Sequence, residues 1–483
     1  MKYKLIKTRA YIGGSWLSAE SGAGFPVFNP ATGEEIARVA DCGADDAARA
    51  IEAAAAAFPE WSRRTGEERS RLLKRWRDLI IGHEEELAQI ITLEMGKPYA
   101  EALGEVRYGA SYVEWFAEEA KRIYGDVIPN ASRGARTIVL KQPVGVCAAI
   151  TPWNFPNAML MRKVAPALGV GCTMVAKPAE DTPLSALAIA ALGEEAGLPP
   201  GVFNVVPSAR PQEVGGVLAT HPAIRKISFT GSTETGRLLL RQSAETVKKA
   251  SMELGGNAPF IVFDDADLDS AVAGAMASKY RNGGQTCVCA NRIFVQQGVY
   301  DAFAERLAAQ AASLKVGPGD EEGAEIGPLI NIRALEKVDA LVRSAVGEGA
   351  KALTGGGSHD LGGLFYAPTV LTGVRNDMEI ARAEIFGPVA SIIPFDGEDD
   401  VIRAANDTIY GLAAYLYTRD LGRAFRVGEA LEYGMVGVNE GVISSAAAPF
   451  GGVKQSGLGR EGSKYGVEDY LEMKYICLGG LGR

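Results

Sequence analysis

Four short apolar segments determine the predicted architecture: VGVCAAI (144–150), CTMVAKP (172–178), GVFNVVP (201–207) and IRKISFTG (224–231). Helix-forming sequence such as Leu184–Ala196 separates them, and Pro, Gly, Ser and Thr gather at their ends. This alternation predicts a parallel β-sheet covered by helices, because parallel strands need crossover connections. A ligand is expected at the carboxyl ends of such strands.

The sequence on either side extends this pattern. Residues 45–58 and 67–94 place apolar side chains at helical spacing, and the second segment ends at the helix-breaking sequence Gly-Lys-Pro. The alanine run at 53–57 fits a helix, because alanine has the highest helix propensity. Strand and helix patterns alternate again from Pro259 to about Leu371, which predicts a second α/β domain.

Length and composition limit the class of protein. A chain of 483 residues is too long for one ordinary core and predicts two or three domains. Hydrophobic residues make up 47% and charged residues 23%, which is typical of soluble globular proteins and excludes a disordered chain. The net charge of −9 disfavours nucleic acid as a partner, although a local cationic pocket for an anionic substrate stays compatible with it.

Targeting signals are not recognised in the sequence. The start, MKYKLIKTRAYIGGSW at 1–16, lacks the apolar core of a signal peptide and the pattern of a transit peptide. The longest weakly polar run, Val164–Ala176, contains proline and glycine and is shorter than the roughly 18 residues of a membrane span. We therefore expect a cytoplasmic protein without a membrane partner.

Cysteine and histidine usage disfavours a metal site. The six cysteines are too sparse for a disulfide framework and contain no CxxC pair, which fits a reducing compartment. The three histidines, His83, His221 and His359, stand far apart in the sequence. No metal and no Cys-His pair is expected, so catalysis must use other bases.

The segment FTGSTETG at 229–236 runs from a strand through Gly231 and Ser232 into a helix. Backbone N–H groups at a helix N-terminus attract phosphate, and glycine allows close approach. The same pattern is also an ordinary helix cap in many proteins, so both interpretations are open on this segment alone.

Two further segments carry reactive side chains. RNGGQTCVCANR at 281–292 surrounds Cys287 with glycine and small polar residues, in a stretch too irregular for a core strand, where a substrate can reach a thiol. MELGGNAP at 252–259 places Glu253 among apolar residues, and burial there would raise its pKa and suit a general base. A packing cysteine and a salt-bridged structural glutamate are the alternatives.

Together with four further motifs, these segments resemble the aldehyde dehydrogenase superfamily over almost the whole chain. The further motifs are ITPWNFP (150–156), KPAEDTP (177–183), EIFGP (384–388) and PFGGVKQSGLGREG (449–462). The resemblance implies an α/β fold with a Rossmann-like cofactor domain, an α/β catalytic domain and a small β oligomerisation extension. The implied boundaries are 1–124 and 144–255 for the NAD-binding domain, 256–455 for the catalytic domain, and 125–143 and 456–483 for the oligomerisation segments. A homodimer or homotetramer is expected.

The resemblance also implies a mechanism. Cys287 attacks the aldehyde as a thiolate, and the side-chain amide of Asn154 and the Cys287 backbone N–H hold the oxyanion. After hydride transfer to NAD, a water activated by Glu253 hydrolyses the thioester. Relatives that transfer the acyl group to CoA typically lack this glutamate, so Glu253 favours hydrolysis.

For the cofactor, the resemblance implies contacts with the adenosine ribose, the pyrophosphate and the nicotinamide ribose. The residues are Trp153, Lys177, Glu180, Gly231, Ser232, Leu254, Glu384 and Phe386. The carboxylate of Glu180 can accept a hydrogen bond from a ribose 2′-OH but repels a 2′-phosphate. NAD is therefore predicted over NADP, which stays the less favoured cofactor.

Three flanking segments, 161–173, 279–292 and 439–475, look like the succinate-semialdehyde dehydrogenase branch of this family. The likeness implies that Arg162 and Arg281 bind a distal carboxylate of the substrate, with Ser444, or its neighbour Ser445, adding a hydroxyl. Surface or interhelical ion pairs are the alternative role for the arginines. Glutarate semialdehyde and 2-oxoglutarate semialdehyde would satisfy the same arginines.

Cys289, two residues from the nucleophile, could form a reversible disulfide with Cys287 if the loop bends enough to bring the two Cα atoms within bonding range, and a small packing residue is the alternative. A catalytically inactive structural or binding member of the fold is the competing class, and retention of Cys287, Glu253 and Asn154 disfavours it. Hydrolysis of activated esters without NAD is a further side activity that the same residues permit.

Overall fold

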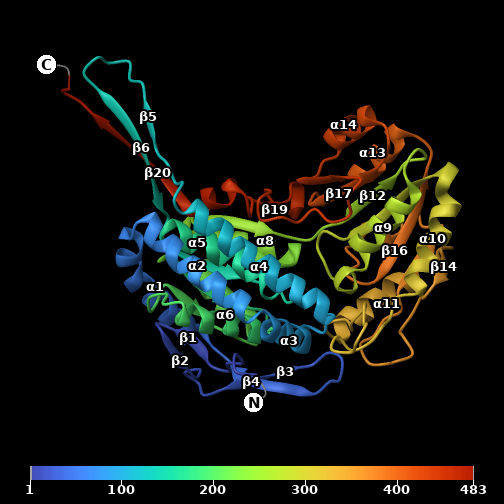
Figure 1. Ribbon diagram of the computed structural model, residues 1–483, viewed down its shortest axis with the longest axis horizontal. Coiled ribbons are helices and arrows are strands. Elements are labelled where there is room, and N and C mark those ends of the chain that lie inside the picture. The colour runs from blue at the N-terminus through green and yellow to red at the C-terminus, as the bar shows by residue number, and fades with distance from the viewer. Residues whose placement is uncertain (1–2, 482–483) are drawn as a thin grey trace.

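The computed structural model describes residues 3–481, which form two large β-sheets and two small ones (Figure 1). The first two and the last two residues of the predicted segments 1–124 and 456–483 lie outside the described residues. Figure 1 shows the N-terminal half with its helices on the left and the second sheet on the right, with a narrow β extension projecting away from both. The α/β architecture predicted from the sequence is confirmed.

The larger sheet has the strand order β19-β11-β10-β7-β8-β9-β1-β2, and β7 to β11 run parallel, as the four apolar segments predict. Its strands are β1 (Ala10–Ile12), β2 (Ser15–Leu17), β7 (Val146–Ile150), β8 (Thr173–Lys177), β9 (Phe203–Val205), β10 (Ile224–Thr230), β11 (Lys249–Glu253) and β19 (Gly457–Leu458). The chain order reverses at β7, which lies between β8 and β10. Their carboxyl ends therefore flank a topological switch point, where such sheets bind ligands.

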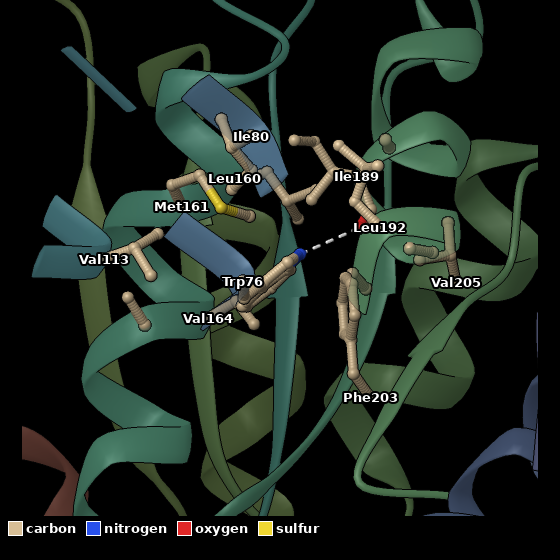
Figure 2. Packing of buried hydrophobic residues seen from close by; sticks show 14 of the residues in the cluster. Trp76, Ile80, Val113, Leu160, Met161, Val164, Ile189, Leu192, Phe203 and Val205 are labelled. Carbon is tan, nitrogen blue, oxygen red and sulfur yellow. Dashed lines mark hydrogen bonds between the residues drawn. The ribbon is translucent and has the colours of Figure 1, made fainter. Parts of the chain in front are cut away.

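Helices cover both faces of this sheet. One face carries α2 (Gly66–Gly82), α3 (Glu84–Met95), α4 (Tyr99–Glu119), α5 (Ala158–Val170) and α6 (Pro183–Glu195), and the other carries α1 (Ala44–Arg63), α7 (Pro211–Thr220) and α8 (Thr233–Ser243). Figure 2 shows the core of the first face, where the indole of Trp76 in α2 donates to the Ile189 carbonyl of α6 at 3.1 Å. Its ring centroid lies 5.7 Å from that of Phe203. This packing fixes α5 and α6, and with them the loops that follow β7 and β8.

The prediction of a single helix over 67–94 is wrong, because α2 ends and α3 begins at His83. The backbone of His83 leaves the helical conformation, with φ −119° and ψ 20°, and its N–H donates to the Leu79 carbonyl at 3.0 Å. Glu84, Glu85 and Glu86 occupy the first turn of α3, where negative charge stabilises a helix N-terminus. The predicted helix at 45–58 is confirmed as part of α1, and Leu184–Ala196 matches α6 except that Ala196 is its C-cap.

The second sheet has the order β14-β15-β16-β13-β12-β17-β18 and is parallel except for β14. It contains β12 (Ala258–Val262), β13 (Ala290–Gln296), β14 (Lys351–Thr354), β15 (Thr369–Thr372), β16 (Val389–Phe395), β17 (Ala413–Tyr417) and β18 (Met435–Val438). Its helices are α9 (Leu268–Lys279), α10 (Tyr300–Ala312), α11 (Ile332–Gly347), α12 (Glu379–Arg382), α13 (Glu398–Asn406) and α14 (Leu421–Ala430). The α/β pattern thus continues well beyond residue 371, where the sequence pattern placed its end.

Two small antiparallel sheets complete the fold. One pairs β3 (Gly24–Phe28) with β4 (Glu35–Ala40), and the other has the order β20-β6-β5, with β5 (Asp126–Ile128), β6 (Arg136–Pro143) and β20 (Leu471–Leu478). The second is the projecting extension of Figure 1, and it exposes large apolar side chains at Val127, Met473 and Tyr475. Short 3-10 helices lie at η1 (Ala244–Thr246), η2 (Arg281–Gly284), η3 (Gln297–Val299), η4 (Lys454–Ser456) and η5 (Lys464–Tyr470). Within residues 3–481, none of the helices has the length and apolar character to cross a membrane.

Candidate active site

A cavity of about 750 Å³ lies at the carboxyl ends of β7, β10 and β11, next to the loop that precedes β13. It is therefore built from the facing ends of the two large sheets. Most of the predicted site residues line it: Trp153, Asn154, Arg162, Gly231, Ser232, Leu254, Arg281, Cys287, Glu384, Phe386 and Ser444.

Four predicted site residues do not line this cavity: Lys177, Glu180, Glu253 and Cys289. Lys177 is buried at the end of β8, where its ammonium donates to the Pro178 carbonyl at 3.1 Å and lies 3.5 Å from the Glu180 carboxylate. Glu180 lines a second cavity of about 400 Å³, against the end of β3 and the turn at 29–33. The motif KPAEDTP thus places its charged side chains beside the main cavity and not in it.

Cys287 is half-buried in the loop between η2 and β13, as the irregular sequence predicts. Burial, with a smaller contribution from the Glu384 carboxylate, raises the pKa of its thiol to about 12. The Gly256 backbone lies close beneath this loop, because a Cβ at Gly256 would be 2.1 Å from the Cys287 carbonyl oxygen. Only glycine permits this approach.

Asn154 reaches the same loop from the other side. Its side-chain Nδ2 donates one hydrogen bond to the Gln285 carbonyl at 2.9 Å. A primary amide carries two N–H hydrogens, so a second donor is left on a side chain that lines the cavity. The cavity therefore holds a thiol and an amide donor on two loops, which the Asn154–Gln285 hydrogen bond joins.

Glu253 ends β11 and is almost completely buried. Burial, followed by the nearby Glu461 carboxylate, raises the pKa of Glu253 well above its usual range. Within the described part of the chain, neither carboxyl oxygen has a hydrogen-bond partner. Both carboxyl oxygens are therefore available to a water molecule.

The wall at the start of α8 presents unpaired polar atoms. Ser232 caps the helix by accepting the Thr235 N–H at 3.3 Å, and a Cβ at Gly231 would lie 2.4 Å from the Phe229 ring. The neighbouring Thr230 hydroxyl is buried without a hydrogen-bond partner among residues 3–481. This helix terminus therefore offers donors and partial positive charge to an anionic group.

Another wall is aromatic and acidic. The rings of Trp153 and Phe386 meet edge to face, with their centroids 5.4 Å apart. Glu384 accepts the Gly256 N–H through Oε1 at 2.8 Å, and burial raises its pKa to about 7. Its second oxygen remains for hydroxyl groups of a ligand.

Two arginines reach the cavity from different elements. Arg162 of α5 is buried, with its guanidinium 3.8 Å from the Phe450 ring centroid and its Nε 2.7 Å from the Glu461 carboxylate. Among the described residues, its Nη2 has no hydrogen-bond partner. Arg281 begins η2 and is half-buried, 5.6 Å from the Phe155 ring centroid. Arg162 is thus partly used in an ion pair, the alternative role that the sequence left open.

Ser444 lines the cavity, whereas the neighbouring Ser445 is exposed and is not part of the lining. Cys289 is buried, where its thiol donates to the Gly284 carbonyl at 3.3 Å and accepts from the Lys279 ammonium at 3.4 Å. Its thiol and that of Cys287 are both free. The redox role of Cys289 stays a prediction.

One wall of the cavity was missed by the sequence analysis. Glu101, Glu105 and Tyr108 line it from α4, and Arg333 and Lys337 line it from α11. The three residues of α4 recur at helical spacing and so share one face, which is a signal that a sequence carries. The sequence does not show, however, that this face points into a cavity.

Comparison with known proteins identifies the family of this chain. The family model described as "Aldehyde dehydrogenase family" matches residues 16–476. The 3-sulfolactaldehyde dehydrogenase of Pseudomonas putida is 59% identical over 99% of this chain and 98% of its own, and the glutarate-semialdehyde dehydrogenase of Pseudomonas aeruginosa is 57% identical over 99% of both. A crystal structure of succinate-semialdehyde dehydrogenase from Burkholderia pseudomallei superposes with a TM-score of 0.97 at 59% identity, covering 98% of both chains. The resemblance predicted from the motifs is confirmed, and the chain belongs to the aldehyde dehydrogenase family.

Proposed function

We propose that this aldehyde dehydrogenase oxidises succinate semialdehyde to succinate with NAD as the hydride acceptor. The observation that carries the proposal is the single cavity in which the Cys287 thiol and the Asn154 amide face two arginines. The thiol and amide suit chemistry at an aldehyde, and the arginines suit a carboxylate at the far end of the same molecule.

In the first step, the Cys287 sulfur bonds to the aldehyde carbon and the carbonyl electrons move onto the oxygen. The second N–H of the Asn154 amide and the backbone N–H of Cys287 stabilise the resulting oxyanion. The thiol must first give its proton to solvent water, which its raised pKa opposes. The positive charge of Arg162 acts in the other direction and lowers the pKa of Cys287.

Two walls of the cavity, one at the start of α8 and one formed by Trp153, Glu384 and Phe386, fit a dinucleotide. The α8 terminus at Gly231 and Ser232 suits a pyrophosphate, the free carboxyl oxygen of Glu384 suits ribose hydroxyls, and Trp153, Leu254 and Phe386 supply apolar walls. Lys177 and Glu180 would hold the adenosine ribose beside the cavity, and the charge of Glu180 favours NAD over NADP. When bound, NAD accepts the hydride that leaves the substrate carbon, so that a thioester forms on Cys287.

Hydrolysis completes the reaction. Glu253 takes a proton from a water molecule, whose oxygen bonds to the thioester carbon. The carbon–sulfur bond then breaks, which releases the acid and restores Cys287. The absence of hydrogen bonds to the Glu253 carboxyl group within the described residues leaves it free to accept that proton.

The substrate class rests on charge. Arg281 and the unpaired Nη2 of Arg162 would bind the distal carboxylate, with Ser444 adding a hydroxyl. The substrates in the names of the three relatives all carry an anionic group, which supports an acidic aldehyde. Glutarate semialdehyde and 2-oxoglutarate semialdehyde are the alternative substrates. An inactive structural or binding member of the fold is disfavoured, because Cys287, Glu253 and Asn154 are all present.

Steady-state kinetics on a panel of aldehydes test the proposal. We expect kcat/KM for succinate semialdehyde to exceed that for uncharged butanal by about 100-fold or more, because the arginines stay unpaired with butanal. Arg281→Met should remove most of this preference. Equal kcat/KM for both aldehydes overturns the role of the arginines, and a higher kcat/KM with NADP than with NAD overturns that of Glu180.

A further inference from the structure

Lys97 and Glu105 form a buried ion pair directly behind Asn154. The Lys97 Nζ lies 2.6 Å from Glu105 Oε2, and neither side chain has any exposed surface. Removing two charges from water is costly, and apolar residues of similar size often stabilise a protein equally well. Stability alone therefore gives little reason for charged residues at these positions.

The Lys97 ammonium also holds the backbone of Asn154. Its Nζ donates to the Asn154 carbonyl at 2.7 Å and lies 3.8 Å from the Phe155 ring centroid. The side-chain Nδ2 of Asn282 donates to the same carbonyl at 3.0 Å. The Asn154 peptide is thus fixed by donors from two separate elements.

Glu105 holds the other end of the same loop. Its Oε1 accepts the backbone N–H groups of Asn157 at 2.9 Å and Ala158 at 3.2 Å, where α5 begins. The two oxygens of one carboxylate therefore connect Lys97, and through it Asn154, to the start of α5. The loop between Asn154 and Ala158 is held at both ends by one ion pair.

We propose that Lys97 and Glu105 are a positioning pair, which fixes the Asn154 peptide so that the second side-chain N–H meets the substrate oxygen. Asn154 already gives one N–H to the Gln285 carbonyl, so a small shift of its backbone misdirects the other. The inference rests on the proposed function, in which Asn154 stabilises the oxyanion. Glu105 lines the cavity, but its two carboxylate oxygens already pair with Lys97 and with the N–H groups of Asn157 and Ala158, so we expect the pair to act through Asn154.

The first experiment replaces the pair by neutral residues of similar size, Lys97→Met with Glu105→Gln. Changing both together avoids a buried charge without a partner. We expect kcat to fall about 10- to 100-fold, because misplacing a catalytic group by about an ångström has such effects. KM for aldehyde and NAD, and the rate at which iodoacetamide alkylates Cys287, should stay within about twofold, because that alkylation builds no oxyanion on a carbonyl.

Arg107→Met is the matched control on the same helix. Arg107 pairs with Glu84 at the exposed surface of α4, so kcat should be unchanged. If the double variant keeps the parental kcat, the inference is overturned. If the double variant does not fold, Lys97→Arg tests the inference in its place, because arginine keeps the positive charge but alters the geometry of the donor. A folded Lys97→Arg enzyme should show reduced kcat, and parental kcat overturns the inference.

The decisive experiment combines the pair with Asn154→Ala. Asn154→Ala alone should lower kcat about 100- to 1,000-fold, as loss of an oxyanion donor does in other enzymes. Adding Lys97→Met and Glu105→Gln to it should change kcat by less than about twofold, because the pair acts through Asn154. If the triple variant loses kcat by the product of the two separate losses, the positioning role is overturned and the proposed function stands. Parental kcat in Asn154→Ala instead overturns the oxyanion role and with it the proposed mechanism.

Discussion

Cys287 has a thiol whose pKa is raised to about 12, and this determines how its reactivity depends on pH. Only the thiolate attacks carbon, so the rate of alkylation by iodoacetamide in the cofactor-free enzyme should rise about tenfold per pH unit between about pH 7 and pH 9. The urea-unfolded enzyme is the control, because its thiols titrate near the ordinary pKa of about 8.5 and their rate levels off above it. A plateau below about pH 8 in the folded enzyme contradicts the raised pKa.

Gly256 determines how closely the first sheet approaches the Cys287 loop. In Gly256→Ala the new methyl group would meet the Cys287 carbonyl, so the loop must move and kcat should fall by about 100-fold. Gly82→Ala, at the end of α2, is the control, since a Cβ there meets no atom within 4 Å. Parental kcat in Gly256→Ala would show that the loop can move without loss of function.

At this scale, the sequence identified the residues whose chemistry lies within one motif. Asn154 and Gly231 line the cavity because their motifs end strands of the first large sheet, and Cys287 lines it because its loop precedes β13 of the second. The ion pair of Arg162 with Glu461 could not be predicted, because the two residues are almost 300 positions apart in the sequence. Only the packing of α5 against the C-terminal segment brings them together.

At the scale of helices, Glu94 closes the N-terminus of α6. Its two carboxyl oxygens accept the backbone N–H groups of Leu184 at 2.7 Å and Ser185 at 2.8 Å, all in the buried interior. Glu94→Ala leaves these two N–H groups unpaired and should lower the free energy of unfolding by about 3 kcal/mol. Urea unfolding followed by circular dichroism measures it. Exposed Glu429→Ala should change it by less than about 0.5 kcal/mol, and an equal effect of both variants contradicts the capping role.

Element boundaries were the weaker part of the sequence analysis. Apolar periodicity continues across Gly82 and His83 with no proline, and a single glycine is tolerated within a helical pattern, so 67–94 reads as one helix although the backbone breaks there. The three glutamates at 84–86 mark the new N-terminus, but acidic clusters are also common on exposed helix faces. The strands at 146–150 and 224–230 can be located more closely from the sequence, because short β-branched and apolar runs between turn residues are typical of buried strands.

The whole molecule exposes an apolar surface on its β extension, at Val127, Met473 and Tyr475. We expect this surface to pair with a second copy, so that the enzyme is a dimer or tetramer at micromolar concentration. Met473→Glu with Tyr475→Glu should lower the mass measured by light scattering after size exclusion. Leu421→Glu, at an exposed position of α14, is the control and should leave the mass unchanged. A monomeric parent enzyme contradicts the assembly.

The predicted domain boundaries come from the resemblance and stay a proposal. One of the predicted segments, 456–483, contributes strands to two different sheets. Residues 456–483 were predicted as an oligomerisation segment, yet β19 within them pairs with β11 at the edge of the first large sheet. The sequence gives little indication of this strand, because β19 has only two residues, Gly457 and Leu458. Such short pairings depend on tertiary packing and leave no pattern in the sequence.

The extension also imposes an order on biosynthesis. Its central strand β6 lies near residue 140, but its longest pairing, eight residues with β20, needs residues 471–478. During translation, more than 300 further residues must therefore be made before the edge of β6 that pairs with β20 can form its backbone hydrogen bonds. A prematurely ended chain keeps that edge open, and the surface proposed for assembly is completed only in a full-length subunit. If subunits pair through this surface as proposed, chains that end before residue 471 cannot take part in the pairing.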